Sequence, residues 1–343
     1  MNTAAPAIWF PTVRTGTGTD VFTQRLVADL CKRGVRAEIT WLPLHAEYAP
    51  WTVPIPQPPA WATVAHVNTW LHTRFIPRGL PVVATIHHAV HHPDACAYKG
   101  PLRAAYHRWW IAPNERRVLR HAQRVVAVSQ FVANSTLHSL LDVPMQVIYN
   151  GVDTERFCPG TRQRQRQPGE PFKLLFVGSW MARKGVDLLA PILRQLGEGF
   201  VLYYTGGPAA EKDKAHMPAN MIDIGRLEGD AAVVAAMQSA DALLFPSRSE
   251  GFGLVAAEAM ACGLPVIAAR SASLVEVVAD GKTGVLCHPE DVAAFVAAAR
   301  FLAADAMRYR VFGKAARRWV EAKFSEGSVL QKYLDIYLTP FTP

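Results

Sequence analysis

Two carboxylates flank a glycine-bearing turn in the segment Ser247–Ala269, SRSEGFGLVAAEAMACGLPVIAA. Glu250 precedes a predicted helix that begins near Leu254, and Glu258 lies within that helix. Free N–H groups at a helix start bind phosphate, and glycine lets the backbone approach a ligand closely. Six residues of helical rise from Phe252 to Glu258 give roughly 9 Å. The two carboxylates could therefore bind hydroxyls at opposite ends of one ligand that carries phosphates in its middle.

A retaining hydrolase would instead place its two carboxyl groups about 5 Å apart across one bond. The alternative for Glu258 is a solvent-facing helix residue without a ligand.

The loop Gly178–Gly185 (GSWMARKG) joins a predicted strand to a predicted helix and carries the cations Arg183 and Lys184. A lysine at a helix start can pair with diphosphate oxygens as the leaving group departs. The loop is therefore a second candidate phosphate site, although Arg183 alone is equally consistent with a solvated loop residue.

Two candidate ligand loops lie in the N-terminal half. Residues 14–20 (RTGTGTD) follow the first predicted strand and supply Gly16 and Gly18. The third glycine of a dinucleotide-binding GxGxxG is absent, so NAD is not expected. These residues predict either a loop near a ligand or a loop that caps the next helix through Thr19 or Asp20.

His87 ends another predicted strand, where side chains can reach a ligand, and His88 follows it. His91 and His92 lie nearby, but no carboxylate or cysteine cluster with ligand spacing accompanies them. The chain has no Asp-x-Asp, GxSxG or paired CxxC motif. We therefore expect no metal and no resident cofactor.

Short apolar runs that alternate with amphipathic stretches must position these residues. This alternation is typical of parallel sheets covered by helices on both faces, so the predicted fold class is α/β with doubly wound sheets. Ligands of such sheets bind at the carboxyl ends of the strands, and a cleft between two such domains is the expected site. The expected strands are Ala7–Phe10, Ala37–Trp41, Val64–Val67, Val82–Ile86, Val125–Val128, Gln146–Tyr149, Lys173–Val177, Val201–Tyr204, Met221–Ile224, Ala242–Phe245, Pro265–Ala269 and Gly284–Cys287.

Proline and glycine mark two other segments. The polar, basic stretch Pro159–Pro171 predicts an interdomain linker, and Pro43–Pro59 predicts an exposed loop without regular structure. The length of 343 residues fits two domains, and 50% apolar residues exclude a mainly disordered chain. No apolar run is long enough for a transmembrane helix, and the first residues do not resemble a secretory signal. Five scattered cysteines favour a reducing cytosol.

The net charge of +8 is unevenly distributed. Residues 1–160 hold 15 Lys and Arg against 9 Asp and Glu, a balance of +6, which leaves +2 for the remainder. The segment Lys99–Arg124 carries seven of these cations and the aromatic residues Tyr106, Trp109 and Trp110, and Tyr98 directly precedes it. Such a mixture suits an anionic membrane surface or single-stranded nucleic acid, and it also suits a solvated helix face with core tryptophans.

The glutamate segment, together with NGVDTERFCP (residues 150–159), FVGSWMARKGVDLL (176–189) and SLVEVVADGKTGVLCHPED (273–291), resembles the retaining GT-B glycosyltransferases of family 4. The resemblance extends over nearly the whole chain. It implies two Rossmann-like, doubly wound domains that face a central cleft, with C-terminal helices that cross back to the N-terminal domain. The implied parts are an acceptor-binding domain (1–158), a linker (159–171), a nucleotide-sugar-binding domain (172–325) and a returning C-terminal helix (326–343).

The resemblance also assigns roles to individual residues. It implies catalytic roles for Glu250, Lys184 and His87, with Glu250 and His87 beside the transferred sugar and Glu258 on the ribose hydroxyls. It places donor contacts at Gly178, Arg183 and the backbone of Phe252, Gly253 and Leu254, and a diphosphate or acceptor loop at Gly16 and Gly18.

This chain departs from the family pattern at two positions. Ser179 stands where the family usually has Arg, and His88 stands where it usually has Asp. We hypothesise that Arg183, next to Lys184, supplies the missing charge.

The implied function is metal-independent transfer of a hexose from a UDP- or GDP-linked donor to a hydroxyl of a glycan or lipid-linked acceptor, with retention. We expect a role in cell-envelope polysaccharide or glycolipid synthesis, in the cytoplasm or peripherally on the inner face of the plasma membrane. The basic segment would face the anionic membrane, and no nucleic-acid partner is expected. The alternatives are a GT-B nucleotide-sugar epimerase and a non-catalytic protein that binds membrane or nucleic acid.

Overall fold

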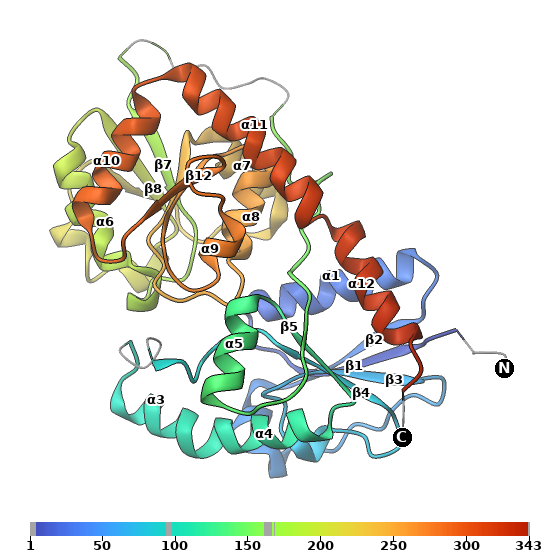
Figure 1. The fold of residues 1–343 in the computed structure, drawn as a ribbon. Helices are drawn as coiled ribbons and strands as arrows, with labels where there is room; N and C mark the ends of the chain where they lie inside the picture. Colours follow the sequence, from blue (N-terminus) through green and yellow to red (C-terminus); the bar gives the residue numbers. More distant parts are fainter. Residues whose placement is uncertain (1–4, 94–97, 161–166, 168, 342–343) are drawn as a thin grey trace. The chain divides into compact units, whose positions relative to one another are not determined.

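The computed structural model describes residues 5–93, 98–160, 167 and 169–341. The chain divides into two compact units, unit 1 (Met1–Gly151 with Glu326–Pro343) and unit 2 (Val152–Ser325). Each unit contains a six-stranded parallel sheet with helices packed on it (Figure 1). The fold class is therefore α/β with two doubly wound sheets, as the alternation of apolar runs predicted.

The sheet of unit 1 has the strand order β2-β1-β3-β4-β5-β6. The residues of β1, β3 and β4 are all buried, which fits strands covered on both faces. The strand order changes direction between β1 and β3, so the loop after β1 lies at a topological switch point. The strands are β1 (Ile8–Val13), β2 (Ala37–Leu42), β3 (Val64–Asn68), β4 (Val82–Ile86), β5 (Arg124–Ala127) and β6 (Gln146–Val147).

The sheet of unit 2 has the order β12-β11-β10-β7-β8-β9. Here the order changes direction between β7 and β10, so the loops that follow these two strands meet at one edge. The core beneath them joins Leu174, Leu189, Leu244 and Phe295, each fully buried. The strands are β7 (Phe172–Phe176), β8 (Phe200–Tyr204), β9 (Met221–Asp223), β10 (Ala242–Phe245), β11 (Val266–Ala269) and β12 (Gly284–Cys287).

Helices cover both sheets (Figure 1). The helices of unit 1 are α1 (Gly18–Lys32), α3 (Pro101–Tyr106), α4 (Ala112–His121), α5 (Gln130–Ser139) and α12 (Glu326–Leu338). Those of unit 2 are α6 (Val186–Leu196), α7 (Gly229–Ser239), α8 (Leu254–Ala261), α9 (Leu274–Val277), α10 (Val292–Ala303) and α11 (Ala306–Lys323). Among the described residues, no helix is long and apolar enough to cross a bilayer.

The C-terminal helix α12 packs in unit 1, beside α1. Its Leu330 and Tyr333 belong to one apolar cluster with Leu26 and Leu30 of α1. The ring of His66 in β3 contacts the Tyr337 hydroxyl of α12 at 2.6 Å through Nδ1. Burial lowers the pKa of His66 to about 3, so this ring is neutral and ties α12 to the sheet without a buried charge.

The two places where the chain passes between the units lie side by side. The Val152 amide donates to the Phe324 carbonyl at 2.8 Å, and Val152 pairs with Ser325 in a β-bridge. The predicted linker at residues 159–171 lies mostly outside the described residues, because 161–166 and 168 are not among them.

The prediction of an irregular loop at Pro43–Pro59 was wrong in part. Two short 3₁₀ helices form there, η1 (Leu44–Glu47) and η2 (Pro50–Thr52). Proline begins the second of them, where its missing N–H costs nothing. The basic segment forms α3, a π-helical turn η4 (His107–Ile111) and α4.

Unit 2 contains a close helix contact that only glycine permits. A Cβ on Gly313 of α11 would lie 2.4 Å from the carbonyl oxygen of Gly263, which follows α8. We expect Gly313→Ala to lower the free energy of unfolding by about 1–3 kcal/mol through overpacking. Denaturant unfolding measures this change. The control is Gly327→Ala, where a Cβ meets nothing within 4 Å, and it should not lower the free energy of unfolding. An equal loss of stability in both variants would contradict the close contact at Gly313.

Candidate active site

The switch point of unit 2 brings two loops together at the carboxyl edge of its sheet. One follows β7 and contains the short 3₁₀ helix η5 (Ala182–Lys184). The other follows β10 and runs from Pro246 to Gly253, where α8 begins. Gly185 makes their close approach possible, since its φ is +69° and a Cβ there would lie 2.2 Å from the Pro246 carbonyl oxygen.

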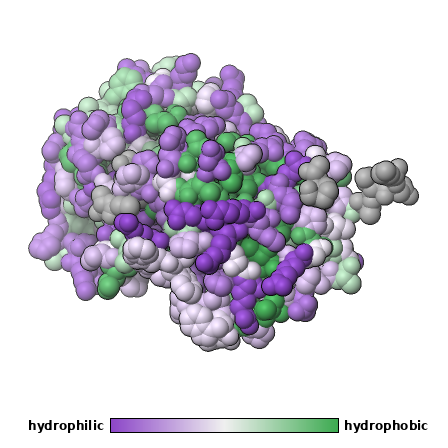
Figure 2. All heavy atoms as spheres, turned by 60° about the horizontal axis from the view of Figure 1, so that its bottom comes forward, coloured by the Kyte–Doolittle hydropathy of each residue, from purple (hydrophilic) through white to green (hydrophobic). Residues whose placement is uncertain are grey.

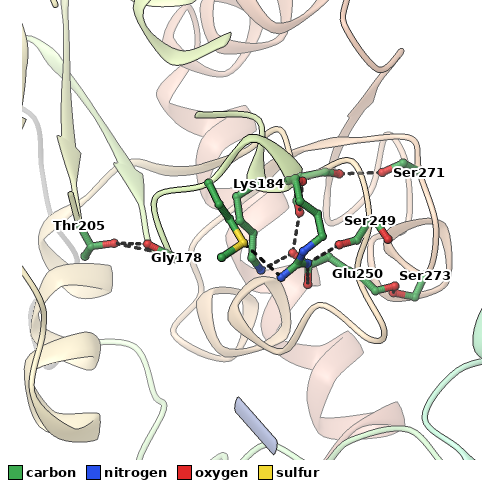
Figure 3. A network of polar contacts seen from close by, with 10 residues as sticks. Gly178, Lys184, Thr205, Ser249, Glu250, Ser271 and Ser273 are labelled. Carbon is green, nitrogen blue, oxygen red and sulfur yellow. Dashed lines mark hydrogen bonds and ion pairs between the residues drawn. The ribbon is translucent and has the colours of Figure 1, made fainter. Parts of the chain in front are cut away.

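Lys184 and Glu250 meet where these loops touch, and their side chains point toward one another (Figure 3). Lys184 Nζ lies 2.5 Å from Glu250 Oε1, and the two side chains are only 13% and 7% exposed. Ser247 Oγ donates to the same carboxylate oxygen at 2.6 Å. Ser273 Oγ donates to the Glu250 carbonyl at 3.2 Å, so both the side chain and the backbone of Glu250 are held.

The ionisation of Glu250 results from two opposing effects. Burial disfavours its charged form, but the nearby charges of Lys184 and Arg183 and the hydrogen bonds from Lys184 and Ser247 outweigh burial. The pKa of Glu250 therefore lies below its ordinary value of 4.5, and the carboxylate is ionised at neutral pH.

Arg183 lies beside this pair rather than in open solvent. Its Nη1 donates to the Ser249 carbonyl at 2.6 Å and lies 3.9 Å from Glu250 Oε2. Its side chain is 32% exposed. Two cations thus surround one carboxylate, so these three side chains together carry one positive charge.

The start of α8 has the backbone geometry that the sequence predicted. Gly253 is the N-terminal cap residue with φ of +91°, and α8 runs through the next eight residues. Phe252 turns its ring into the core, where it meets Phe324 at 5.2 Å between centroids. Glu258 is 6% exposed, so the alternative of a solvent-facing residue was wrong.

Gly178 lies at the end of β7 and is held by the segment after β8. The Gly178 amide donates to Thr205 Oγ1 at 2.9 Å, and the Thr205 hydroxyl donates back to the Gly178 carbonyl at 3.1 Å (Figure 3). Gly178, Arg183, Lys184 and the residues of the glutamate segment therefore belong to one unit and one sheet edge.

Unit 1 holds the other predicted residues. His87 is 5% exposed, and its Nε2 lies 2.9 Å from Asn68 Oδ1. Asn68 Nδ2 donates to Thr12 Oγ1 at 2.8 Å, and in this orientation of the amide Asn68 Oδ1 accepts from the protonated Nε2 of His87. Burial, with His88 and His66 nearby, lowers the pKa of His87 well below 6.5. The neutral ring then has Nδ1 as an acceptor.

The loop after β1 is held by the carboxylate of Asp20, in the first turn of α1. Asp20 accepts hydrogen bonds from the backbone amides of Thr15 and Gly16, at 2.9 and 2.7 Å. Gly16 has φ of +70°, and Gly18 begins α1. The N-terminal cap residue of α1 is Thr17, without a side-chain cap hydrogen bond, so Asp20 in the first turn holds the preceding loop and does not cap the helix.

The described residues contain no cluster of three or more His, Cys, Asp or Glu side chains that could hold a metal ion. His91 contacts the buried Glu115 carboxylate, with 2.6 Å between Nε2 and Oε2.

Two models of protein families match the chain. The model for glycosyl transferases group 1 matches residues 159–319, and the model for glycosyltransferase family 4 matches residues 19–156. A D-inositol 3-phosphate glycosyltransferase of Catenulispora acidiphila is 30% identical over 306 residues, which cover 80% of this chain and 71% of that protein. The chain belongs to glycosyltransferase family 4.

Other curated relatives of this family 4 chain are similar over shorter parts. The sulfoquinovosyl transferase of Arabidopsis thaliana is 37% identical over 183 residues, which are 50% of this chain and 35% of that protein. A glycogen synthase of Mycobacterium tuberculosis is 30% identical over 76% of this chain and 63% of its own length.

Solved structures establish that this family 4 chain has the GT-B fold. Sucrose-phosphate synthase of Thermosynechococcus elongatus aligns with a TM-score of 0.76 and 20% identity, over 96% of this chain and 98% of that one. WaaG, titled a glycosyltransferase involved in lipopolysaccharide biosynthesis, aligns with a TM-score of 0.71 and 18% identity over 97% and 100%. HepE of Anabaena, solved with UDP-glucose, aligns with a TM-score of 0.71 and 17% identity over 96% and 98%.

Sequence reasoning missed several residues that hold the site in place. Ser247 and Ser273 orient Glu250, Thr205 holds Gly178, and Asn68 orients His87. Their partners lie 3 to 27 residues away, so no local motif marks them. Ser247 stands three residues before Glu250 in the glutamate segment, and Ser273 begins the quoted segment 273–291, but neither pattern marks the serine as a partner of Glu250.

The ion pair of Glu250 predicts a specific pH dependence. A folded-state pKa below 4.5 means that ionised Glu250 contributes stability in full above pH 4.5, and that this contribution is lost as the pH falls through the folded pKa. We expect the difference in free energy of unfolding between wild type and Glu250→Gln to be constant from about pH 8 to 5.5. Below 4.5 it should shrink, by about 1.4 kcal/mol per unit of pKa depression.

Denaturant unfolding of both proteins at each pH measures this difference, and the subtraction removes the titration of other groups. A difference that stays constant down to about pH 3 would mean that the ion pair does not stabilise the fold, because the unfolded carboxyl group is largely protonated there.

Proposed function

We propose that this chain transfers a hexose from a nucleotide-diphosphate sugar to an acceptor hydroxyl, with retention and without a metal. The observation that supports this best is the buried contact between Lys184 and Glu250 at the switch point of unit 2. Two cations, one carboxylate and the start of α8 converge there. This combination suits a diphosphate that is bonded to a sugar with free hydroxyls.

The roles of the residues follow from their chemistry. Lys184, with Arg183 beside it, would face the diphosphate and stabilise its charge as the bond from phosphate oxygen to the anomeric carbon breaks. The backbone N–H groups of Gly253 and Leu254 at the start of α8 would add to this stabilisation. Glu250 would hold Lys184 extended and accept a hydrogen bond from a sugar hydroxyl, and Glu258 would bind the ribose.

The bond changes balance without a resident cofactor. The acceptor oxygen forms the new bond to the anomeric carbon on the face that the phosphate leaves, and its proton passes to the departing phosphate oxygen. The products are the glycoside and a nucleoside diphosphate. Catalysis would then come from positioning both substrates and from stabilising the leaving group, which needs no enzymatic nucleophile.

A panel of UDP-, GDP- and ADP-linked sugars tests the proposal, with and without crude cell-envelope lipid as acceptor. We expect one UDP- or GDP-linked donor to release its nucleoside diphosphate only when acceptor is present, and NMR of the product to give the donor's anomeric configuration. Lys184→Ala should lower turnover by about 10²-fold or more, as for loss of one transition-state contact.

Arg183→Ala should also lower turnover if Arg183 supplies the charge that Ser179 lacks. Arg310→Ala, on the exposed side of α11, is the control and should retain activity. Clean interconversion of the sugar from donor alone would favour the epimerase and contradict the transferase. No thermal stabilisation by UDP, GDP or ADP would favour the non-catalytic alternative.

We also propose that unit 1 binds an anionic membrane surface, where a lipid-linked acceptor would be found. The face with α3 and α4 comes forward in Figure 2, where strongly hydrophilic side chains lie beside apolar ones. Leu102 and Trp109 are 87% and 72% exposed, and Arg103 and Arg108 are exposed between them. Trp51 of η2, 64% exposed, extends this surface through its ring contact with Trp110.

Exposed cations next to interfacial aromatic side chains are the residues that anionic lipid attracts, at about 1 kcal/mol per Lys or Arg. On this proposal the protein acts at the inner face of the plasma membrane in cell-envelope glycan synthesis. Nucleic acid is not the expected partner.

Liposome co-sedimentation at low salt tests the membrane proposal. We expect binding to anionic but not to neutral vesicles, and loss of binding when Arg103, Arg108 and Arg120 are all changed to Glu. These three are exposed, whereas Arg116 donates to the Leu140 carbonyl and supports the fold.

The matched control reverses three exposed cations of α11, Arg310, Lys314 and Arg318, which changes the net charge equally. Equal loss in both triple variants would mean that only net charge matters. Equal sedimentation with neutral vesicles would also contradict the proposal.

A further inference from the structure

Arg248 is a buried arginine two residues before Glu250, and its side chain is only 6% exposed. Its guanidinium makes five hydrogen bonds, a number that equals its five N–H donors. Nη1 donates to the Ala182 carbonyl at 2.5 Å and to Asp187 Oδ1 at 2.6 Å. Nη2 donates to Asp187 Oδ2 at 2.7 Å and to Glu290 Oε2 at 2.6 Å, and Nε donates to Glu290 Oε1.

Two of these partners lie just before and just after Arg183 and Lys184 in the sequence. Ala182 immediately precedes Arg183, and Asp187 lies in the first turn of α6. The Arg248 amide also donates to the Arg183 carbonyl at 2.9 Å. The stretch that carries Arg183 and Lys184 is therefore bonded to Arg248 before it, within it and after it.

The third partner, Glu290, fixes the other end of the guanidinium. It lies between β12 and α10 and has φ of +67°, a conformation that favours glycine. A glutamate at such a position has a strained backbone, while its carboxylate makes two hydrogen bonds to Arg248. The two hydrogen bonds to Arg248 explain why a glutamate, rather than a glycine, occupies this position. Arg248 thus links three loops at one edge of the unit 2 sheet.

The positive charge of Arg248 is more than offset within this group, whose net charge is −1. Asp187 and Glu290 together carry two negative charges against its one positive charge. A diphosphate would find no surplus positive charge here, in contrast to Lys184 and Arg183. The role of Arg248 is therefore geometric.

We propose that Arg248 is a positioning residue that fixes Lys184 and Arg183 opposite Glu250 by clamping the loops after β7, β10 and β12 together. The kinetic test of this inference rests on the proposed function, because it needs the active donor. Only the planar, five-donor guanidinium can bond both oxygens of two carboxylates and a carbonyl at once, because these are five acceptors and a lysine ammonium has three donors and no fork.

Two conservative variants test the clamp. Arg248→Lys retains the charge and removes the fork, and Glu290→Gln retains the shape at a partly exposed position. With the active donor, we expect kcat to fall by about tenfold in each variant and KM to stay within about threefold, because the lost alignment matters most in the transition state. Arg310→Met, on exposed α11, should leave both unchanged.

A double-mutant cycle separates positioning from a general structural effect. If Arg248 acts through Lys184, Arg248→Lys should lower kcat much less in a Lys184→Ala background than in wild type. Equal losses in both backgrounds, or an unchanged kcat in Arg248→Lys, would overturn the proposal.

Amide hydrogen exchange provides a readout that needs no substrate. Residues 182–187 should exchange faster in Arg248→Lys and Glu290→Gln than in wild type, with the core strand β7 unaffected. Unchanged exchange at 182–187 would overturn the clamp. If wild type turns over no donor, the proposed function fails, while faster exchange in the variants would still support the clamp.

Discussion

The ion pair between Lys184 and Glu250 is the constraint on which the rest of the site depends. A buried carboxylate is costly unless it is paired and hydrogen-bonded, and Glu250 is held by Lys184 and Ser247 at 2.5 and 2.6 Å. This pair requires the loops after β7 and β10 to touch. This contact between the loops in turn requires a glycine at position 185, because a Cβ there would collide with the Pro246 carbonyl. Sheet topology, loop conformation and charge placement therefore meet in one contact.

At this edge of the unit 2 sheet, a candidate site for an anion combines two cations with a carboxylate. Lys184 and Arg183 alone would repel one another, and Glu250 between them lowers that repulsion while leaving a net positive charge. Arg248 pairs with Asp187 and Glu290 behind them and offsets one of their two negative charges. In unit 1 the corresponding polar residues are neutral. His87 and His66 are buried with lowered pKa values, and their hydrogen bonds fix ring orientation without charge.

Much of the fold could be predicted from sequence, because buried parallel strands read as short apolar runs between turn residues. The alternation predicted twelve strands, and the structure has strands at all of these places. The glycines of the glutamate segment also predicted that a helix begins near Leu254, where α8 begins. The short helices at Leu44–Glu47 and Pro50–Thr52 were missed, since proline density marks irregular backbone but equally permits the first position of a helix.

The parts of the site that sequence reasoning missed depend on long-range contacts. Arg248 is a lone arginine in a polar loop, and only the fold brings Asp187 and Glu290, 61 and 42 residues away, onto its guanidinium. Asn68 and Thr205 likewise act across strands. Local patterns reveal which residue types can perform chemistry, whereas the residues that orient them become visible only when neighbouring strands are known.

The most direct test of the central claim is a crystal structure of the chain with the nucleoside diphosphate of its active donor. The account predicts diphosphate oxygens within hydrogen-bonding distance of Lys184 Nζ and of the backbone N–H groups of Gly253 and Leu254, with Glu250 still beside Lys184. A diphosphate bound elsewhere, with Lys184 paired only to Glu250, would contradict it.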